Sequence, residues 1–155
     1  PEKIKYVLGS EIDFAGMTVT AVYSDGSTRV LEAGEYSVDK TTADVAGQAV
    51  KVTVSYREKT DSFDITVGEL VSISITKPTK TVYTVGEKLD TTGMVVYANY
   101  SFGIESEDVT ENAVCQPIEF TEAGQIEVTV TYGDLGVGLI VTGTFPVTVV
   151  EAVTP

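Results

Sequence analysis

The chain of 155 residues contains no histidine and no tryptophan, and it has a single cysteine, Cys115. Histidine is the usual general base and a common metal ligand near neutral pH, so its absence excludes catalytic triads, histidine–cysteine pairs and most zinc sites. A lone cysteine excludes an internal disulfide and any CxxC motif. Because free cysteine usually behaves as a small apolar residue, we expect Cys115 to be buried or half-buried.

Positive charge is scarce in the second half of the chain. No Lys or Arg occurs from Leu89 to Pro155, a stretch with ten Asp and Glu, and the whole chain has a formal charge of −13. Such a surface repels phosphate backbones and anionic headgroups, so we do not expect nucleic acid as a partner. The longest uncharged run, 135–150, is interrupted by three glycines and a proline. We therefore expect no direct membrane insertion, and no segment resembles a signal peptide.

The sequence does contain an internal repeat with an offset of 77 residues. The matching stretches share turn glycines and apolar positions, and they are YVLGSEIDFAGMTVTAVY (6–23) with YTVGEKLDTTGMVVYANY (83–100), AGQ (46–48) with AGQ (123–125), VKVTVSY (50–56) with IEVTVTY (126–132), and SFDITV (62–67) with TFPVTV (144–149). Identity at such positions over this length predicts two copies of one domain of about 75 residues.

The repeated stretches have the alternating pattern of half-buried β-strands. In 17–23, Met, Val, Ala and Tyr alternate with Thr and Val, and in 50–56 Val and Tyr alternate with Lys, Thr and Ser. This pattern is typical of strands with one buried face, and Ser24-Asp25-Gly26 between two of them predicts a tight hairpin turn. No long stretch has a helical period. Since an apolar sheet face must be covered, we predict an all-β chain in which each copy forms a two-sheet sandwich.

The domain boundary predicted from the repeat separates 1–68 from 69–155. Only Gly68-Glu69-Leu70 joins the last strand of copy one to the first strand of copy two, so we expect an end-to-end arrangement with limited hinge motion. Copy one has no counterpart of 71–77, so domain 1 is expected to lack its first strand segment, as a fragment cut from a longer array would. Copy two contains an additional hairpin at about 133–143.

The repeated motif also resembles a known family. Both copies contain Y-x-x-G-x-x-[IL]-D-x-x-G-M-x-V, followed by AGQ, VTV-x-Y and a closing F-x-[IV]-T-V. This combination resembles the bacterial immunoglobulin-like domain family, group 3. Copy one also has the YSDGST (23–28) of that pattern, whereas copy two departs from it with YSFGIE (100–105) and with the insertion GDLGVGLIVTG (133–143).

The resemblance implies two tandem immunoglobulin-like β-sandwich domains. It further implies a repeat of surface-anchored and secreted bacterial proteins, commonly a stalk, a spacer or an adhesion module. The family has no catalytic residues to carry over to this chain, and function does not follow from fold alone.

One acidic loop of copy two is a candidate for calcium binding. Oxygen-rich loops bind calcium through six to eight carboxylate and carbonyl ligands. The loop lacks the Asp-x-Asp-x-Asp-Gly spacing, and a run of charge is usually a solvated loop, so both interpretations stay open. The candidate ligands are Glu105, Glu107, Asp108 and Glu111.

The insertion in copy two is the most distinctive candidate binding surface. Its apolar residues either fold back onto their own domain or form an exposed lip that contacts the next domain or a partner. The candidate partner-binding residues are Leu135, Val137, Leu139 and Ile140. Phe14, Tyr97 and Phe102 are candidates for exposed aromatic side chains. Stacking on sugars would need a flat cluster of rings, and the chain has no tryptophan.

From these observations we expect a non-enzymatic spacer or stalk in a bacterial cell-surface or secreted multidomain protein. The alternative is an adhesion or carbohydrate- or protein-binding module that uses the domain 2 loops, in one version as an accessory to a glycoside hydrolase. The chain has many carboxylates, but glycosidase acids need a cleft that small sandwiches seldom offer. We expect no cofactor other than the calcium candidate. The expected partners are neighbouring domains of the same chain and a host protein or glycan, and the chain is expected to be a monomer.

Overall fold

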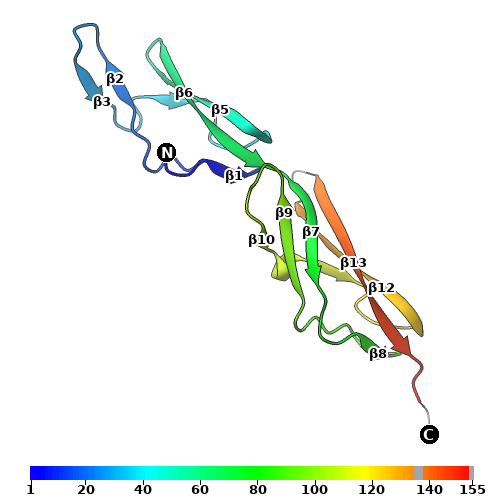
Figure 1. Ribbon diagram of the computed structural model, residues 1–155. Coiled ribbons are helices and arrows are strands. Elements are labelled where there is room, and N and C mark those ends of the chain that lie inside the picture. The colour runs from blue at the N-terminus through cyan, green and yellow to red at the C-terminus, as the bar shows by residue number, and fades with distance from the viewer. Residues whose placement is uncertain (135–137, 154–155) are drawn as a thin grey trace. The chain divides into compact units, whose positions relative to one another are not determined.

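The computed structural model of the chain describes residues 1–134 and 138–153 (Figure 1). In these residues the chain is all-β, as predicted, with thirteen strands and one 3-10 helix, η1 (Thr110–Asn112). It divides into two compact units, which are unit 1 (Pro1–Glu69 with Ser101–Ile104) and unit 2 (Leu70–Tyr100 with Glu105–Pro155). No helix in the described part of the chain is long and apolar enough to cross a membrane.

Unit 1 is built from two sheets. One sheet has the strand order β1-β6-β5-β4, with β1 parallel to β6 and the other neighbours antiparallel, and a second sheet pairs β2 with β3. The strands are β1 (Lys5–Val7), β2 (Thr20–Val22), β3 (Thr28–Val30), β4 (Ser37–Val38), β5 (Gly47–Tyr56) and β6 (Lys59–Gly68). The sequence predicts a strand over 17–23, but β2 covers only three of these residues.

Unit 2 repeats this plan with one additional strand. Its sheets have the orders β10-β9-β7 and β11-β12-β13-β8, with β8 parallel to β13. The strands are β7 (Leu70–Thr76), β8 (Val82–Thr84), β9 (Val95–Tyr100), β10 (Glu107–Asp108), β11 (Val114–Gln116), β12 (Gly124–Asp134) and β13 (Leu139–Val150). Strand β7 has no counterpart among the strands of unit 1, and it covers most of the segment 71–77 that has no match in copy one.

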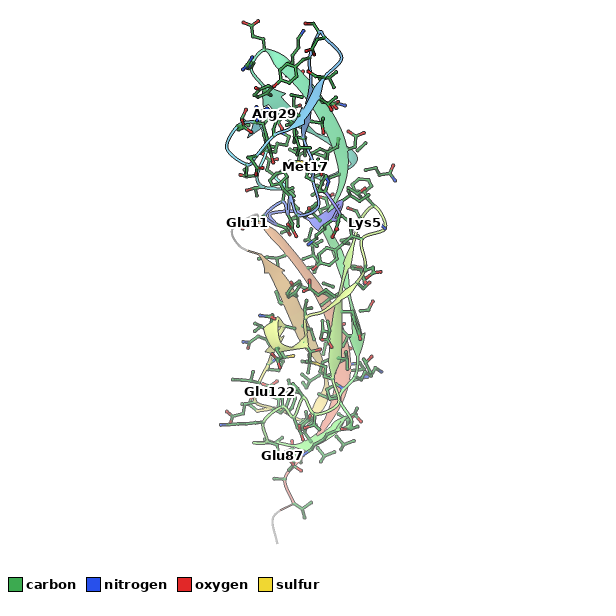
Figure 2. The ribbon with its side chains drawn as sticks, turned by 90° about the vertical axis from the view of Figure 1, so that its left-hand side faces the viewer. Lys5, Glu11, Met17, Arg29, Glu87 and Glu122 are labelled. Atoms are coloured by element: carbon green, nitrogen blue, oxygen red, sulfur yellow. The ribbon has the colours of Figure 1, made fainter. Side chains whose placement is uncertain are left out.

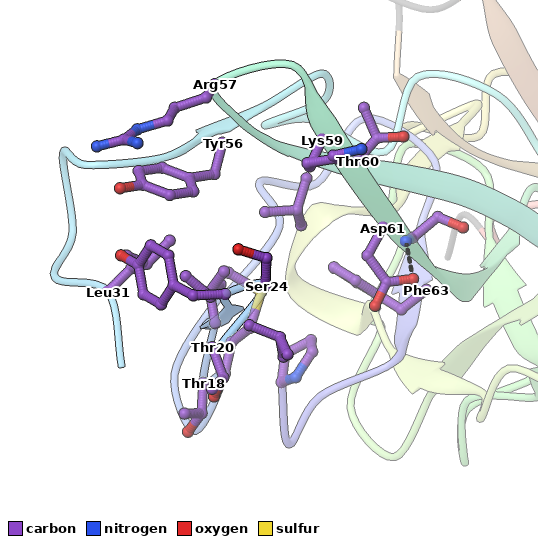
Figure 3. Close-up of a pocket in the computed structure, with 18 residues that line it drawn as sticks. Thr18, Thr20, Ser24, Leu31, Tyr56, Arg57, Lys59, Thr60, Asp61 and Phe63 are labelled. Carbon is purple, nitrogen blue, oxygen red and sulfur yellow. Dashed lines mark hydrogen bonds between the residues drawn. The ribbon is translucent and has the colours of Figure 1, made fainter. Parts of the chain in front are cut away.

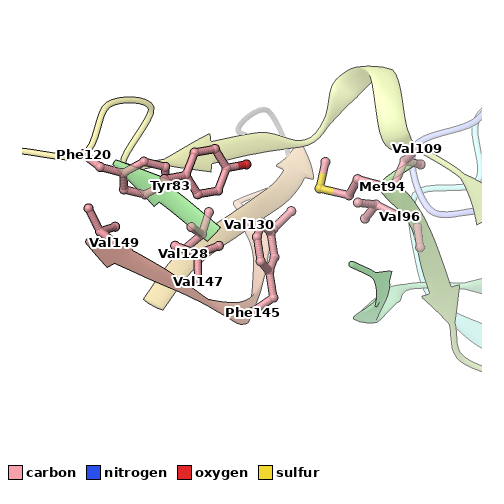
Figure 4. Packing of buried hydrophobic residues seen from close by; sticks show 11 residues of the cluster. Tyr83, Met94, Val96, Val109, Phe120, Val128, Val130, Phe145, Val147 and Val149 are labelled. Atoms are coloured by element: carbon pink, nitrogen blue, oxygen red, sulfur yellow. The ribbon is translucent and has the colours of Figure 1, made fainter. Parts of the chain in front are cut away.

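A buried apolar cluster fills the space between the two sheets of unit 2 (Figure 4). It combines side chains from β8, β9, β12 and β13 with Met94, Val109 and Phe120, and the rings of Tyr83 and Phe120 lie 4.6 Å apart. Ile73 and Ile75 of β7 pack against this cluster from one side. The alternating strand positions predicted from the sequence therefore do face a common core.

The corresponding cluster in unit 1 is smaller. Among the described residues it contains six buried side chains, against eleven in unit 2, and these six are Tyr6, Ile12, Ala43, Val52, Ile65 and Val67. Ala21, Leu31 and Val54 are also buried in unit 1 but lie outside this cluster. No charged side chain is buried in the described part of the chain, and Lys5, Glu11, Arg29 and Glu122 are all exposed (Figure 2).

The signature tyrosine of each repeat is buried, and its hydroxyl organises the loop that follows. The Tyr83 hydroxyl accepts a hydrogen bond from the Asp90 amide at 3.1 Å and lies 3.2 Å from the carbonyl oxygens of Lys80 and Asp90. Tyr6 has the same three contacts in unit 1, with Asp13 and Lys3. Gly93, within the Gly-Met pair, has a φ of +85°, a conformation that glycine adopts without strain. The residues shared by the two repeats therefore form the same local structure in both units.

The segment Ser101–Ile104 comes from copy two but belongs to unit 1. The Glu69 amide donates to the Ser101 hydroxyl at 2.9 Å, and the Ser101 amide donates to the Glu69 carbonyl at 2.9 Å. A side chain at Gly68 would be 2.5 Å from Ile104 Cγ1, so this glycine permits the close approach. The loop 101–104 therefore lies against the end of β6.

Candidate functional site

A groove of about 660 Å³ opens in unit 1 beside β2 (Figure 3). One wall is the segment from Met17 to Ser24, which contains β2, and the facing wall consists of the adjoining ends of β5 and β6. Pro1 lies at the groove as well. All of these residues belong to unit 1.

The floor of the groove is apolar. Met17, Val19 and Phe63 line it and are only half-buried. Their counterparts in the second repeat are buried, with exposed fractions of 7%, 0% and 0% for Met94, Val96 and Phe145 respectively. The same core positions are therefore covered in unit 2 and open in unit 1.

The rim at one end of the groove is aromatic and cationic. The guanidinium of Arg57 lies 5.2 Å from the centre of the Tyr56 ring, and Arg29 contacts the hydroxyls of Tyr23 and Tyr56 at 3.5 Å each. Arg29 also forms a bidentate pair with Glu35 at 3.1 and 2.9 Å. The hydrogen bond from Arg29 lowers the pKa of Tyr23, and the same guanidinium lowers the pKa of Glu35.

The equivalent tyrosine in unit 2 has a different environment. Burial, followed by the neighbouring Tyr132, raises the pKa of Tyr100, and the Tyr100 hydroxyl donates to Glu107 at 3.1 Å. Neither Arg29 nor Arg57 has a basic counterpart in copy two. The cationic rim is therefore a property of unit 1 alone.

The groove offers little acid–base chemistry. Among the described residues that line it, Asp61 is the one carboxylate, and its Oδ1 accepts a hydrogen bond from the Ser62 amide at 2.8 Å. Glycoside hydrolysis commonly needs two opposed carboxyl groups. The described residues that line the groove supply no such pair.

The four calcium candidates are exposed and do not converge. Asp108 accepts hydrogen bonds from the Thr110 amide and hydroxyl at 3.0 and 2.6 Å, which lower its pKa and secure the start of η1. Glu107 accepts from Tyr100, and Glu111 lines a small pocket beside Asp108, whereas Glu105 lies apart from that pocket. The described residues contain no group of three or more His, Cys, Asp or Glu arranged to hold a metal ion. Calcium binding thus stays a prediction without support from this geometry.

The predicted partner-binding hairpin is an extension of β12 and β13. Gly133 pairs with Ile140 and Asp134 with Leu139, so the two strands continue into the insertion. Ile140 is 51% exposed, and Leu139 is half-buried. The other two candidates, Leu135 and Val137, lie outside the described residues.

The three candidate aromatic residues have different environments. Tyr97 and Phe102 are exposed, with fractions of 43% and 42%, but they belong to different units. Phe14 packs against the core cluster of unit 1, so its expected exposure was wrong. Cys115 is half-buried beside Met94, as expected, and burial raises the pKa of its thiol.

The groove was not predicted from the sequence, although two signals for it were present. Copy one lacks the residues that form β7 in copy two, and it nevertheless keeps the bulky core residues Met17 and Phe63. A core position without the strand that covers it predicts an opening at that place. Nothing in the sequence indicated the cationic rim. The contact between Arg29 and Tyr56 depends on how segments far apart in the sequence pack together.

Comparison with known proteins places both repeats in one family. The family model of the bacterial Ig-like domain (group 3) matches residues 1–67 and 76–149. The chain is similar to "Pectate lyase L" of Thermoclostridium stercorarium, with 36% identity over 116 residues, or 74% of this chain and 9% of that protein. It is also similar to "Exo-beta-1,6-galactobiohydrolase" of Bifidobacterium longum subsp. longum, with 31% identity over 165 residues, or 100% of this chain and 10% of that protein. The chain thus spans about a tenth of the length of these relatives.

Proposed function

The chain belongs to the bacterial Ig-like domain family, group 3, and we propose that it is a non-catalytic spacer in a larger extracellular carbohydrate-active enzyme. The observation that carries this proposal is that the two relatives named for a lyase and a hydrolase share only about a tenth of their length with this chain. A segment of that size supplies a module of such proteins, and the rest of each relative has ample length for the named activity. The single carboxylate at the groove of unit 1 supports a non-catalytic role.

The extracellular location is part of the same proposal. Intact polysaccharide chains are too large to cross a bacterial envelope, so an enzyme that degrades them must work outside the cell. The formal charge of −13 favours a soluble module that does not associate with itself. The end-to-end arrangement and the monomeric state expected from the sequence stay predictions within this proposal.

A direct test measures whether the chain maintains the distance between its ends. Cysteines introduced at Glu2 and Glu151, in a Cys115→Ser background, would carry a fluorophore pair for single-molecule energy transfer. A spacer gives one narrow distance distribution, whereas a flexible Gly/Ser chain of the same length gives a broad one. A distribution as broad as that of the flexible chain would contradict the spacer function.

Binding of polysaccharide is the competing function, and a second assay addresses it. The purified chain is run through native gels that contain polygalacturonate or a β-1,6-linked galactan, with bovine serum albumin as a non-binding reference. A spacer migrates equally in gels with and without polysaccharide. Retardation that disappears on deletion of 134–142, with the unfolding temperature retained, would instead assign binding to the hairpin of unit 2. Its exposed Ile140 is the observation that keeps this alternative in view.

A further inference from the structure

Each unit joins an early strand to its last strand by parallel pairing (Figure 1). In unit 1, β1 pairs with β6, with Lys5 opposite Thr66 and Val7 opposite Gly68. In unit 2, β8 pairs with β13 in the corresponding register. The other strand pairs of the described residues are antiparallel. We call β1 with β6, and β8 with β13, the terminal pair of each unit.

Hydrogen bonds extend each terminal pair beyond its three paired positions. In unit 1, the Thr66 amide donates to the Ile4 carbonyl, and the Leu8 amide donates to the Gly68 carbonyl, at 2.8 Å each. Unit 2 has the two equivalent bonds at 2.9 Å each, which run from the Thr148 amide to the Thr81 carbonyl and from the Val85 amide to the Val150 carbonyl. The terminal pair is therefore built in the same way in both units.

The direction of the strands determines how tension acts on the terminal pair. A spacer is attached at both of its ends, so tension enters unit 1 ahead of Lys5 and leaves it after Gly68. Because the two strands are parallel, these points lie at opposite ends of the paired segment. Tension thus pulls the strands in opposite directions along their axes and loads all the hydrogen bonds between them at once.

A tyrosine at the centre of the terminal pair attaches the shorter strand to the core. Tyr6 lies opposite Val67, its side chain is 2% exposed, and its hydroxyl accepts a hydrogen bond from the Asp13 amide at 3.1 Å. Tyr83 has the same place in β8, opposite Val149, with an exposed fraction of 1%. Sliding of β1 or β8 must therefore draw a buried ring out of the core as well as break backbone hydrogen bonds.

We propose that both units are load-bearing and that the terminal pair of each, with its central tyrosine, resists tension applied along the chain. This inference rests on the proposed spacer function, and it adds that the spacer keeps its fold when its ends are pulled apart. The resistance depends on direction, since a force that opens the pair from one end breaks its hydrogen bonds one after another. The free energy of unfolding, in contrast, is the same for every direction of pulling.

The test pulls unit 1 of the full chain in two directions with optical tweezers, through DNA handles on cysteines in a Cys115→Ser background. Handles at Glu2→Cys and Glu69→Cys load the terminal pair from opposite ends, whereas handles at Glu2→Cys and Asp64→Cys load it from one end. All three positions are exposed. We expect the mean unfolding force to be at least about twofold higher for opposite ends, because forced unfolding is governed by the unfolding rate and not by equilibrium stability.

Two further variants make the comparison independent of one substitution. Ser62→Cys, also exposed on β6, replaces Asp64→Cys in a second one-end arrangement and should give the same low force. Tyr6→Phe keeps the ring but removes the bond to Asp13, and it should reduce the ratio of the two forces. A loss of general stability alone would lower both forces and leave the ratio unchanged, which would contradict the role of the tyrosine.

Equal forces in the two directions, or a higher force for the one-end arrangements, would overturn the proposal. Failure of the spacer function appears separately, as a broad distance distribution in the absence of load. A narrow distribution together with equal forces would leave the spacer function in place and overturn only the load-bearing role.

Discussion

At the scale of single residues, Tyr6 and Tyr83 show why the two repeats have the same residue at this position. Each ring is buried, with exposed fractions of 2% and 1%. Each hydroxyl accepts a hydrogen bond from one backbone amide and lies within hydrogen-bonding distance of two carbonyl oxygens. A buried ring supplies apolar contact, and its hydroxyl satisfies part-buried backbone groups of the loop. The tyrosine therefore links the loop to the core in both units.

The substitution Tyr83→Phe should test this link. It keeps the ring but leaves the Asp90 amide without its partner, so we expect the free energy of unfolding of unit 2 to fall by about 1–2 kcal/mol. Urea unfolding followed by tyrosine fluorescence measures the change. Tyr97→Phe is the matched control, because Tyr97 is 43% exposed, and its effect should stay within about 0.5 kcal/mol. Equal effects of the two substitutions would contradict this role for the hydroxyl.

Asp90 makes a second residue-scale prediction, which concerns pH. Its Oδ1 accepts hydrogen bonds from the hydroxyl and the amide of Thr92 at 2.6 and 3.0 Å, and these bonds lower the pKa of Asp90. A lowered pKa in the folded state stabilises the fold above the unfolded pKa of about 3.9, and the contribution is lost as the pH falls through the folded value. Asp90→Asn should therefore lower the Tm at pH 7, and the difference from the wild type should shrink below about pH 4.

Thermal unfolding at a series of pH values checks this prediction. The control is Glu122→Gln, which changes the net charge equally at an exposed position. A Tm difference between Asp90→Asn and the wild type that stays constant with pH would show that the carboxylate charge is not responsible.

The tight turns could be predicted from the sequence, because glycines and aspartates have local conformational preferences. The hairpin predicted at Ser24-Asp25-Gly26 is present: Gly26 has a φ of +87°, and Asp25 accepts from the Ser27 amide at 2.9 Å. The partners of the tyrosine hydroxyls were not readable, since a spacing in the sequence does not give the path of a loop around a ring. Phe14 illustrates the same limit, because its burial depends on where its loop folds back.

At the scale of elements, the two repeats allow β9, which pairs with β7, to be compared with β2, which has no such neighbour. With β7 present, the second-repeat strand β9 covers six residues, and without it the first-repeat strand β2 covers three. Alternation in the sequence predicted both strands equally, because it reports which face is apolar. It does not report whether a neighbouring strand is present to complete the hydrogen bonds, and this is why the prediction for 17–23 was too long.

Truncation of the β7 side chains should reproduce the condition of unit 1 within unit 2. Ile73→Ala and Ile75→Ala each remove a half-buried side chain from the core, so we expect losses of about 1–3 kcal/mol in the free energy of unfolding. Chemical denaturation gives the size of the effect. Val71→Ala is the control on the same strand, because Val71 is 58% exposed and should contribute within about 0.5 kcal/mol. A loss for Val71→Ala as large as for Ile75→Ala would contradict the inward role of the isoleucines.

At the scale of the whole molecule, the two units differ in how much core each contains. The described residues of unit 1 form a cluster of six buried side chains beside an open groove, whereas those of unit 2 form a cluster of eleven that β7 covers. Burial of apolar surface is the main favourable term in folding, so the difference should appear as unequal stability. The sequence predicted two domains of one design, but not this inequality, since their apolar contents are similar.

We expect the chain to unfold in two transitions, with unit 1 unfolding at the lower temperature or denaturant concentration. Hydrogen exchange measured by mass spectrometry at increasing urea concentration can follow each unit separately. Peptides from β5 and β6 should lose protection before peptides from β12 and β13. The order is informative because these two hairpins have corresponding sequences outside the insertion at 133–143, and β7 packs only against the second of them. A single transition with equal loss of protection in both hairpins would mean that the open groove costs unit 1 no stability.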